Sequence, residues 1–151
     1  MTTRNNPPAA SGGGGVPLDL TKAKSLETMD PAVTYLATLT KCGQGPSKTS
    51  GEPCANFEYT IEEPEKYSTR KVFDTVNLKN ENTQGRFIQH MIALGETEEN
   101  LKSGKFIFNP DEYEGRQVTL NINLDKAGAY EGNARMRKIR GPEVYASMTS
   151  L

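Results

Sequence analysis

GRQVTLNINL, DKAGAYEG and NARMRKIR follow one another over residues 115–140 and decide the fold. The first ten residues alternate apolar and polar side chains, a period of two that predicts a half-buried strand. Its apolar positions are Val118, Leu120, Ile122 and Leu124. Residues 125–132 hold two glycines and an aspartate and predict a loop. Because the last eight residues carry four basic side chains and no acidic one, we expect a hairpin with one apolar and one cationic side.

Three strands precede this hairpin in the same alternating pattern. A period of two predicts strands over residues 33–39, 55–61 and 70–78, separated by turn-rich segments at 42–53 and 62–66. Consecutive strands joined by such turns form an antiparallel meander. In the third strand the side chains expected on the core face are Val72, Val76 and Leu78. Those expected on the opposite face are Lys71, Phe73 and Thr75.

Between the third and fourth strands the pattern changes to a helical period. The apolar residues at helical spacing, which we expect in the core, are Phe87, Ile88, Met91, Ile92 and Leu94. Asn82 or Thr83 is the expected N-cap, Gly95 is the expected C-terminal stop, and a short helical turn is expected over 98–102. Five strands with one helix between the third and fourth predict a mainly β protein. The expected architecture is the five-stranded OB-fold, a partly open Greek-key barrel whose end the helix closes.

The barrel does not account for the whole chain. Residues 1–16, MTTRNNPPAASGGGGV, show no periodicity and are rich in glycine and proline, so we expect a flexible N-terminal tail. This tail and a weakly patterned lead-in make up residues 1–30. The OB-fold domain is expected over 31–145, with a short C-terminal tail at 146–151.

Composition and charge limit the classes of function. No segment approaches the ~18 apolar residues that span a bilayer, and the N-terminus lacks an apolar signal-peptide core. We therefore expect an intracellular protein without membrane contact. The net charge of −1 hides a segregation of sign, because residues 52–65 hold five acidic and no basic residues, whereas residues 66–90 hold five basic and two acidic ones. This predicts a polarised surface, with ordinary solvated faces as the alternative.

Enzyme and metal sites find no support in the sequence. His90 is the single histidine and there are two cysteines, too few for a zinc site or a disulfide framework. Residues 43–49, GQGPSKT, lack the glycine directly before Lys48 and the following helix that a phosphate loop requires. The glutamates at 62–65 lack the spaced aspartates of a calcium loop. We expect no catalytic residue, no metal and no cofactor.

Short motifs, in order along residues 33–142, resemble those of a known family. They are Tyr35-Leu36-Ala37, Gly85-Arg86-Phe87, Ala93-Leu94-Gly95, NPDEYEGR at 109–116 and Tyr130-Glu131-Gly132. With them the chain resembles a family of small phage-encoded proteins, long catalogued as a domain of unknown function, that are similar to OB-fold single-stranded DNA-binding proteins. The resemblance implies action in the host cytoplasm. One departure is that residues 144–151 contain no acidic residue, whereas many such proteins end in an acidic tail that recruits partners.

We therefore hypothesise a sequence-independent single-stranded DNA-binding protein for phage DNA replication or recombination. OB-folds bind such ligands on strands two and three and on the loops joining strands one–two and four–five, with cations along the backbone and aromatic rings against the bases. The expected binding residues are Lys48, Tyr67, Arg70, Lys71, Phe73, Lys126, Tyr130, Arg135, Arg137 and Lys138. The alternative for Phe73 is an inward orientation, and for the basic fifth strand it is a solvated barrel edge.

The sequence leaves other ligands and partners open. Stacking and phosphate contacts do not read the 2′-hydroxyl, so RNA is an alternative to DNA. Phage replication or recombination proteins and a second copy of the chain are the protein partners to consider. The alternative function is a structural or protein-docking OB-like phage accessory protein, which the near-zero net charge favours.

Overall fold

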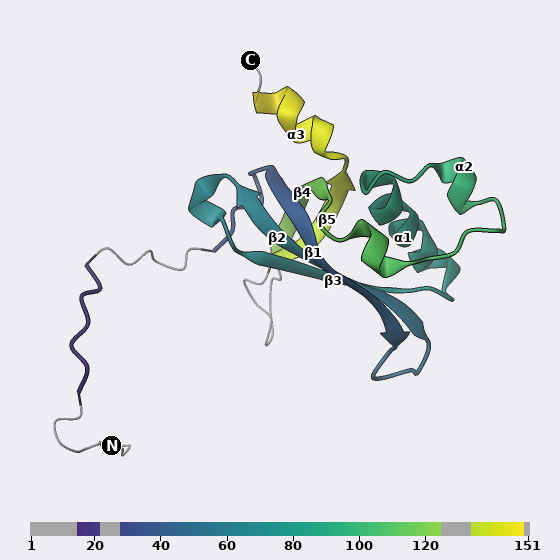
Figure 1. Ribbon diagram of the computed structural model, residues 1–151, viewed down its shortest axis with the longest axis horizontal. Helices are drawn as coiled ribbons and strands as arrows, with labels where there is room; N and C mark the ends of the chain where they lie inside the picture. The colour runs from purple at the N-terminus through teal and green to yellow at the C-terminus, as the bar shows by residue number, and fades with distance from the viewer. Residues whose placement is uncertain (1–14, 22–27, 125–133, 150–151) are drawn as a thin grey trace.

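The computed structural model describes residues 15–21, 28–124 and 134–149 and shows a mainly β protein with one five-stranded antiparallel sheet (Figure 1). The strands are β1 (Tyr35–Pro46), β2 (Pro53–Glu63), β3 (Lys71–Asn77), β4 (Gln117–Leu124) and β5 (Ala134–Arg140). The helices are α1 (Glu81–Ala93), α2 (Glu98–Leu101) and α3 (Pro142–Thr149), and short 3-10 turns are η1 (Glu65–Tyr67) and η2 (Pro110–Tyr113). The expected order of three strands, a helix and two strands is confirmed.

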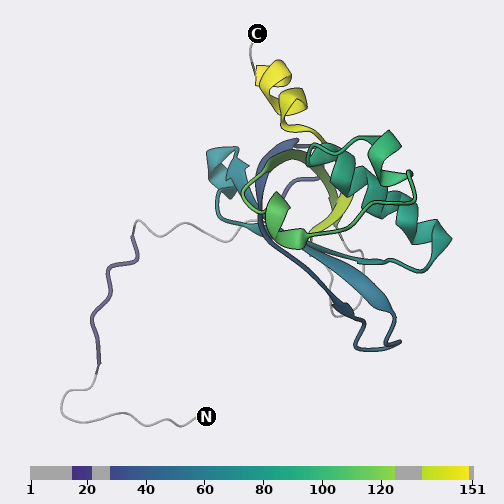
Figure 2. The ribbon, with the colours of Figure 1, turned by 45° about the vertical axis from the view of Figure 1, so that its right-hand side comes forward.

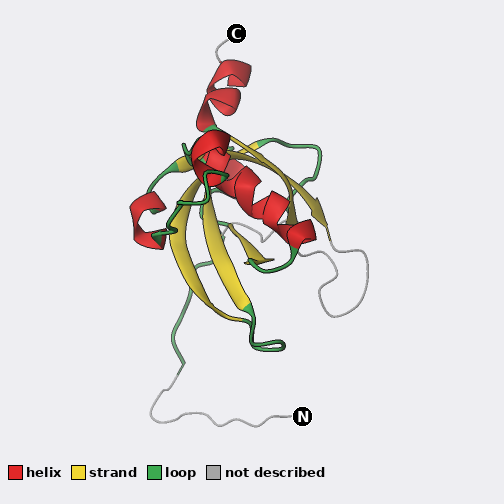
Figure 3. Cartoon of the chain, turned by 90° about the vertical axis from the view of Figure 1, so that its right-hand side faces the viewer, coloured by secondary structure: helices red, strands yellow, loops and turns green. Residues whose placement is uncertain are grey.

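The sheet has the strand order β3-β2-β1-β4-β5, so β1 is central and β3 and β5 are the edges. It curves strongly (Figure 2), and the two edge strands contact each other without being hydrogen-bonded neighbours in the described part of the chain. The sheet is therefore not closed. Figure 3 shows α1 lying against the sheet, and α1 contacts both β3 and β5.

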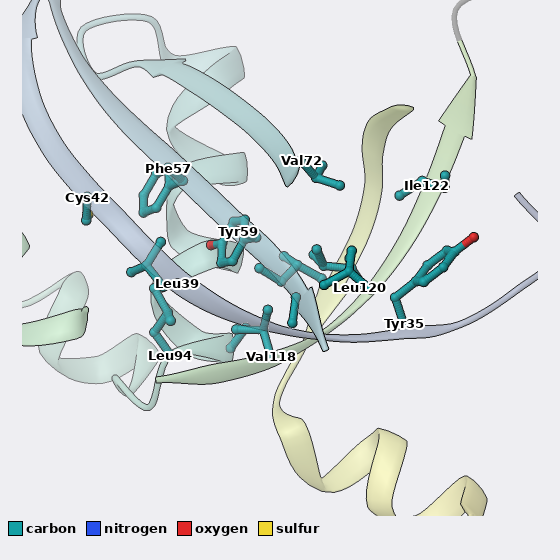
Figure 4. Close-up of a cluster of buried hydrophobic side chains, with 14 of the residues drawn as sticks. Tyr35, Leu39, Cys42, Phe57, Tyr59, Val72, Leu94, Val118, Leu120 and Ile122 are labelled. Carbon is teal, nitrogen blue, oxygen red and sulfur yellow. The ribbon is translucent and has the colours of Figure 1, made fainter. Parts of the chain in front are cut away.

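The core lies on the inner face of the curved sheet, where the alternating residues of all five strands meet (Figure 4). The fully buried strand residues include Tyr35, Leu39, Tyr59, Val72, Val76, Val118, Leu120 and Ile122. The period of two predicts each of them on the inward side, so alternation identifies the core face of the strands. At roughly 1.5–3 kcal/mol for each large apolar side chain, this burial is the main stabilising contribution to the fold.

The β1–β2 hairpin is longer than the sequence indicates. Residues 42–46 and 53–54, expected as loop, belong to the strands, with Gly43 opposite Asn56 and Gly45 opposite Cys54. The actual turn is short and is closed by a hydrogen bond of 2.8 Å from Ser47 N to Glu52 O. Glycines are typical of loops, so the sequence predicts a loop here. In the structure the backbone of Gly43 and Gly45 pairs with β2, and this pairing cannot be read from the local sequence. Figure 1 shows this hairpin reaching beyond the rest of the sheet.

Helix α1 differs from expectation at its start and on its buried face. Its N-cap is Asn80, whose side chain accepts a hydrogen bond from Asn82 N, so neither Asn82 nor Thr83 caps it. Ile92, expected in the core, is 45% exposed, whereas His90 is fully buried. The face turns in this way because His90 has polar partners inside the protein. Gly95, at φ +110°, ends the helix as expected.

Helix α3 is not expected from the sequence, and the domain boundary predicted at 145/146 falls inside it. It contacts β4 and β1 and covers part of the outer side of β4. Thr119, a polar and therefore solvent-facing position in the predicted strand, is buried: its Oγ1 donates to Gly141 O at 2.7 Å and accepts from Tyr145 N at 3.1 Å. Asn121 is buried likewise, held between Thr34 and Arg140.

The segment before β1 also departs from the expected boundaries. Met29, assigned to the lead-in, is buried in the core. The backbone of Asp30 exchanges two hydrogen bonds with the Tyr35 hydroxyl, at 2.9 and 2.8 Å. The folded unit therefore begins before residue 31. Residues 1–14, expected as a flexible tail, lie outside the described part of the chain.

Candidate nucleic-acid interface

The outward side chains of β1, β2 and β3 form two neighbouring rows, which we call the outer face. One row is Lys41, Glu58 and Phe73, and the next is Gly43, Asn56 and Thr75. Between them runs a third row, Cys42, Phe57 and Asp74, whose side chains turn away from this face toward the core and α1. The strand pairing alone thus aligns an aromatic ring, a cation, a carboxylate and an amide on one face.

A hollow of about 450 Å³ lies on the outer face and is lined by both outward rows, by the third row between them and by Glu114. Phe73 stands at this hollow with 58% of its surface exposed, and it is the one exposed aromatic side chain among the described residues. The space beside Gly43 is open, because a Cβ at that position would meet no atom within 4 Å. The face therefore offers an uncovered ring with open space beside it.

Polar groups around the hollow are held in place by hydrogen bonds. Thr75 Oγ1 donates to Asn56 Oδ1 at 2.9 Å. The Glu58 carboxylate accepts from Thr40 Oγ1 at 2.9 Å and lies 3.5 Å from Lys71 Nζ. Slight burial opposes ionisation of Glu58, but the Thr40 hydrogen bond and the Lys71 ammonium outweigh it and lower its pKa. Glu58 is therefore an acceptor-only group at neutral pH.

Behind the outer face, a buried polar network fixes β3 to α1. His90 Nε2 and the Asp74 carboxylate are 2.7 Å apart, and His90 Nδ1 and the Tyr59 hydroxyl are 2.5 Å apart. Arg86 binds the same carboxylate through Nε and Nη2, at 3.0 and 2.9 Å. Phe57 stacks on the imidazole with ring centroids 3.9 Å apart. Asp74 follows Phe73 directly, so the network holds the backbone that presents the exposed ring.

The ionisation of this network follows from its burial. Burial lowers the pKa of His90, and its hydrogen bond to Asp74 offsets this only in part, so the ring is neutral. Burial raises the pKa of Asp74, but the hydrogen bonds from His90 and Arg86 outweigh it and leave the pKa below its ordinary value. An ionised carboxylate only accepts, so Nε2 carries the proton and Nδ1 accepts from Tyr59 O–H. His90 is fully buried, and its bond to Asp74 links α1 to β3.

Some of the predicted binding residues lie on the outer face and others do not. Phe73 points outward, so its inward alternative is wrong, and Lys71 is exposed beside it. Arg70 is half-buried just before β3, and Lys48 is exposed in the β1–β2 turn. Tyr67 is a wrong prediction for base stacking, because η1 turns its ring into the core, edge-to-face with Tyr35 at 5.4 Å.

The basic strand β5 lies at the opposite edge of the sheet from β3. Arg135, Arg137 and Lys138 are all exposed, and a register shift in the pairing with β4 places Arg137 and Lys138 side by side on the surface. β5 also contacts β3, so the two edge strands lie close together. Lys126 and Tyr130 lie outside the described residues.

Sequence reasoning misses several residues of the outer face. Lys41, Gly43 and Asn56 line the hollow but are not among the predicted residues, although the alternation in 55–61 already puts Asn56 outward. Lys41 and Gly43 escape prediction because the glycine-rich segment around them is typical of a loop. The signal that would find them is the register across the hairpin, which needs the actual turn position.

Comparison of the sequence with protein-family models and with curated proteins finds no match. Within the described ranges, no group of three or more histidine, cysteine or acidic residues is placed to hold a metal ion. Both cysteines are free and buried. Among the helices of the described residues, none is long and apolar enough to cross a membrane.

Proposed function

We propose that the protein is an OB-fold single-stranded DNA-binding protein without strong sequence preference. The strand order, with β1 central and edges that contact each other, supports a partly open barrel, and α1 between β3 and β4 contacts both edges. In such barrels the ligand lies on strands two and three. Here that face carries the exposed aromatic ring and the hollow.

The observation that carries the proposal is the exposure of Phe73 on β3. Exposing so much of a phenyl ring on the surface has no stabilising effect on the fold, whereas a base stacked on it contributes roughly 1–3 kcal/mol to binding. Lys71 lies two residues from the ring on β3, and Lys41 lies in the same cross-strand row on β1. Both lysines are exposed, so they can reach phosphates on either side of a stacked base. The basic residues of β5 extend the cationic surface.

In the proposed mechanism, cations bind successive phosphates while bases turn toward the sheet and one stacks on Phe73. Duplex DNA presents no free base face, so single strands are preferred. RNA single strands present the same faces and phosphates and are the alternative ligand. We place the activity in phage DNA replication or recombination in the host cytoplasm, following the resemblance of the motifs.

The test is fluorescence anisotropy with labelled single-stranded and duplex oligonucleotides of about 20–30 nucleotides at ~50 mM salt. The proposal expects saturable binding to single strands and weaker binding to duplex. Absence of binding to both would reject it.

The second candidate function is docking of a protein partner. The observation that favours it is a groove of about 700 Å³ between α3 and the sheet, lined by Leu36, Tyr145 and Ala146 beside the carboxylates of Glu63 and Glu143. Such a surface suits a partner segment with apolar and basic side chains. If single strands do not bind, this candidate takes precedence.

A further inference from the structure

The hollow beside Phe73 is rich in hydrogen-bond acceptors. Glu58 and Glu114 both line it and contribute carboxylate oxygens. Glu114 is held there by the hydrogen bond that its Oε2 accepts from Cys42 N at 2.9 Å. Thr75 also lines the hollow, and because it donates its hydroxyl proton to Asn56 Oδ1, it can serve a ligand only as an acceptor.

The donors near the hollow come from the side chains of Lys41 and Asn56. Lys71 is directed to Glu58, at 3.5 Å. A carboxylate has about four lone-pair positions and accepts several donors at once, so these contacts do not exhaust Glu58. The charged residues that line the hollow are the acidic Glu58, Asp74 and Glu114 and the basic Lys41. The edge of a ligand that enters the hollow therefore meets mainly acceptors.

The bases of DNA differ in what they offer to such a wall. Cytosine and adenine carry exocyclic amino groups, and carboxylates accept from cytosine N4 in known readout geometry. Thymine carries a carbonyl oxygen in place of that amino group, so a carboxylate beside it leaves two acceptors facing each other. An unpaired or repelled polar group in a partly desolvated site reduces affinity.

We propose that the hollow is a base-selective subsite: a base stacked on Phe73 is accepted when it presents an amino group to Glu58, the cross-strand neighbour of Phe73, and thymine is disfavoured. This inference rests on the proposed function, since it needs a single strand on the outer face. Stacking and backbone flexibility alone would favour runs of pyrimidines, thymine included. The proposed subsite predicts the opposite for thymine.

The experiment measures Kd by anisotropy for oligo(dC) and oligo(dT) of about 20 nucleotides at one salt concentration, for the wild type, Glu58→Gln and Glu62→Gln. Glu62 is the matched control, because it lies on the same strand and its substitution removes the same charge, but it does not line the hollow. The wild type is expected to bind oligo(dC) about fivefold or more tightly than oligo(dT). Glu58→Gln should reduce this ratio toward one, because its amide donates to the thymine carbonyl, whereas Glu62→Gln should leave the ratio unchanged.

The outcomes separate the two proposals. Binding of both oligonucleotides with equal affinity, or tighter binding of oligo(dT), overturns the base-selective subsite and leaves DNA binding intact. A preference for oligo(dC) that survives in Glu58→Gln also overturns it, because the selection then arises elsewhere. Failure of the wild type to bind either oligonucleotide rejects the proposed function itself.

Discussion

His90 on α1 lies 2.7 Å from the carboxylate of Asp74 on β3, and this bond joins the helix to the strand that presents Phe73. Tyr59 binds His90 on the core side and Arg86 binds Asp74 on the surface side, so the polar contacts run from the core to the surface. A buried hydrogen-bond network of this kind stabilises the fold only while every polar group in it is paired. The network therefore connects the stability of the fold to the geometry of the outer face.

Asp74→Ala should lower the free energy of unfolding by about 3 kcal/mol, because it leaves the His90 N–H buried without an acceptor and removes the partner of Arg86. Urea denaturation followed by circular dichroism measures this. The control is Asp111→Ala, which removes an exposed carboxylate and should change the free energy by no more than about 0.5 kcal/mol. Equal effects of the two substitutions would show that the network does not stabilise the fold.

Acidification should destabilise the protein before the carboxylates titrate. The unfolded chain takes up a proton on His90 near pH 6.5, whereas the folded chain, with its lowered pKa, does not. The unfolded state then binds more protons, so the free energy of unfolding falls as pH decreases below about 6.5. The slope is at most about 1.4 kcal/mol per pH unit for one proton.

Because His90 is the single histidine, denaturation between about pH 7 and pH 5.5 reports on it with little interference. His90→Gln should be less stable at neutral pH but should lack the slope in this range. A slope that persists in this variant would contradict the assignment. Asp74 adds a second decrease of stability below pH 3.8, since its folded pKa is also lowered.

Thr119→Val should cost about 1–2 kcal/mol, since it removes the hydroxyl that Gly141 O and Tyr145 N use, in a fully buried position. Thr75→Val, at an exposed position, should be nearly neutral for stability. Thermal or urea unfolding compares the two. A neutral Thr119→Val would mean that α3 is not packed on β4 as described.

The same residues show how far the sequence alone predicts the structure. Alternation puts Phe73 outward and Val72 inward correctly, because strand periodicity is a local property. The burial of His90 depends on Asp74 and Tyr59, distant in sequence, so the helical pattern does not reveal it. Thr119 has the pattern of an exposed residue because its cover, α3, lies after the end of β5. For His90 and Thr119, burial is decided by residues distant in sequence, so the local pattern does not predict it.

The basic strand should contribute to DNA binding through charge alone. Arg135→Ala with Arg137→Ala should weaken binding and reduce the slope of log Kd against log salt by about 0.7 for each phosphate that the arginines neutralise. Both side chains are exposed, so stability should change little. Anisotropy at several salt concentrations measures the slope. An unchanged slope would remove β5 from the interface.

The proposed role of Phe73 as the stacking platform for a single-stranded base is best tested by anisotropy of Phe73→Ala against the wild type, with Ile107→Ala as control. Both residues are exposed, at 58% and 73%, so neither substitution should unfold the protein. Phe73→Ala is expected to weaken single-strand binding by about 1–3 kcal/mol, about fivefold or more in Kd, with an unchanged salt slope, while Ile107→Ala binds like the wild type. Wild-type affinity in Phe73→Ala would show that no base stacks on this ring.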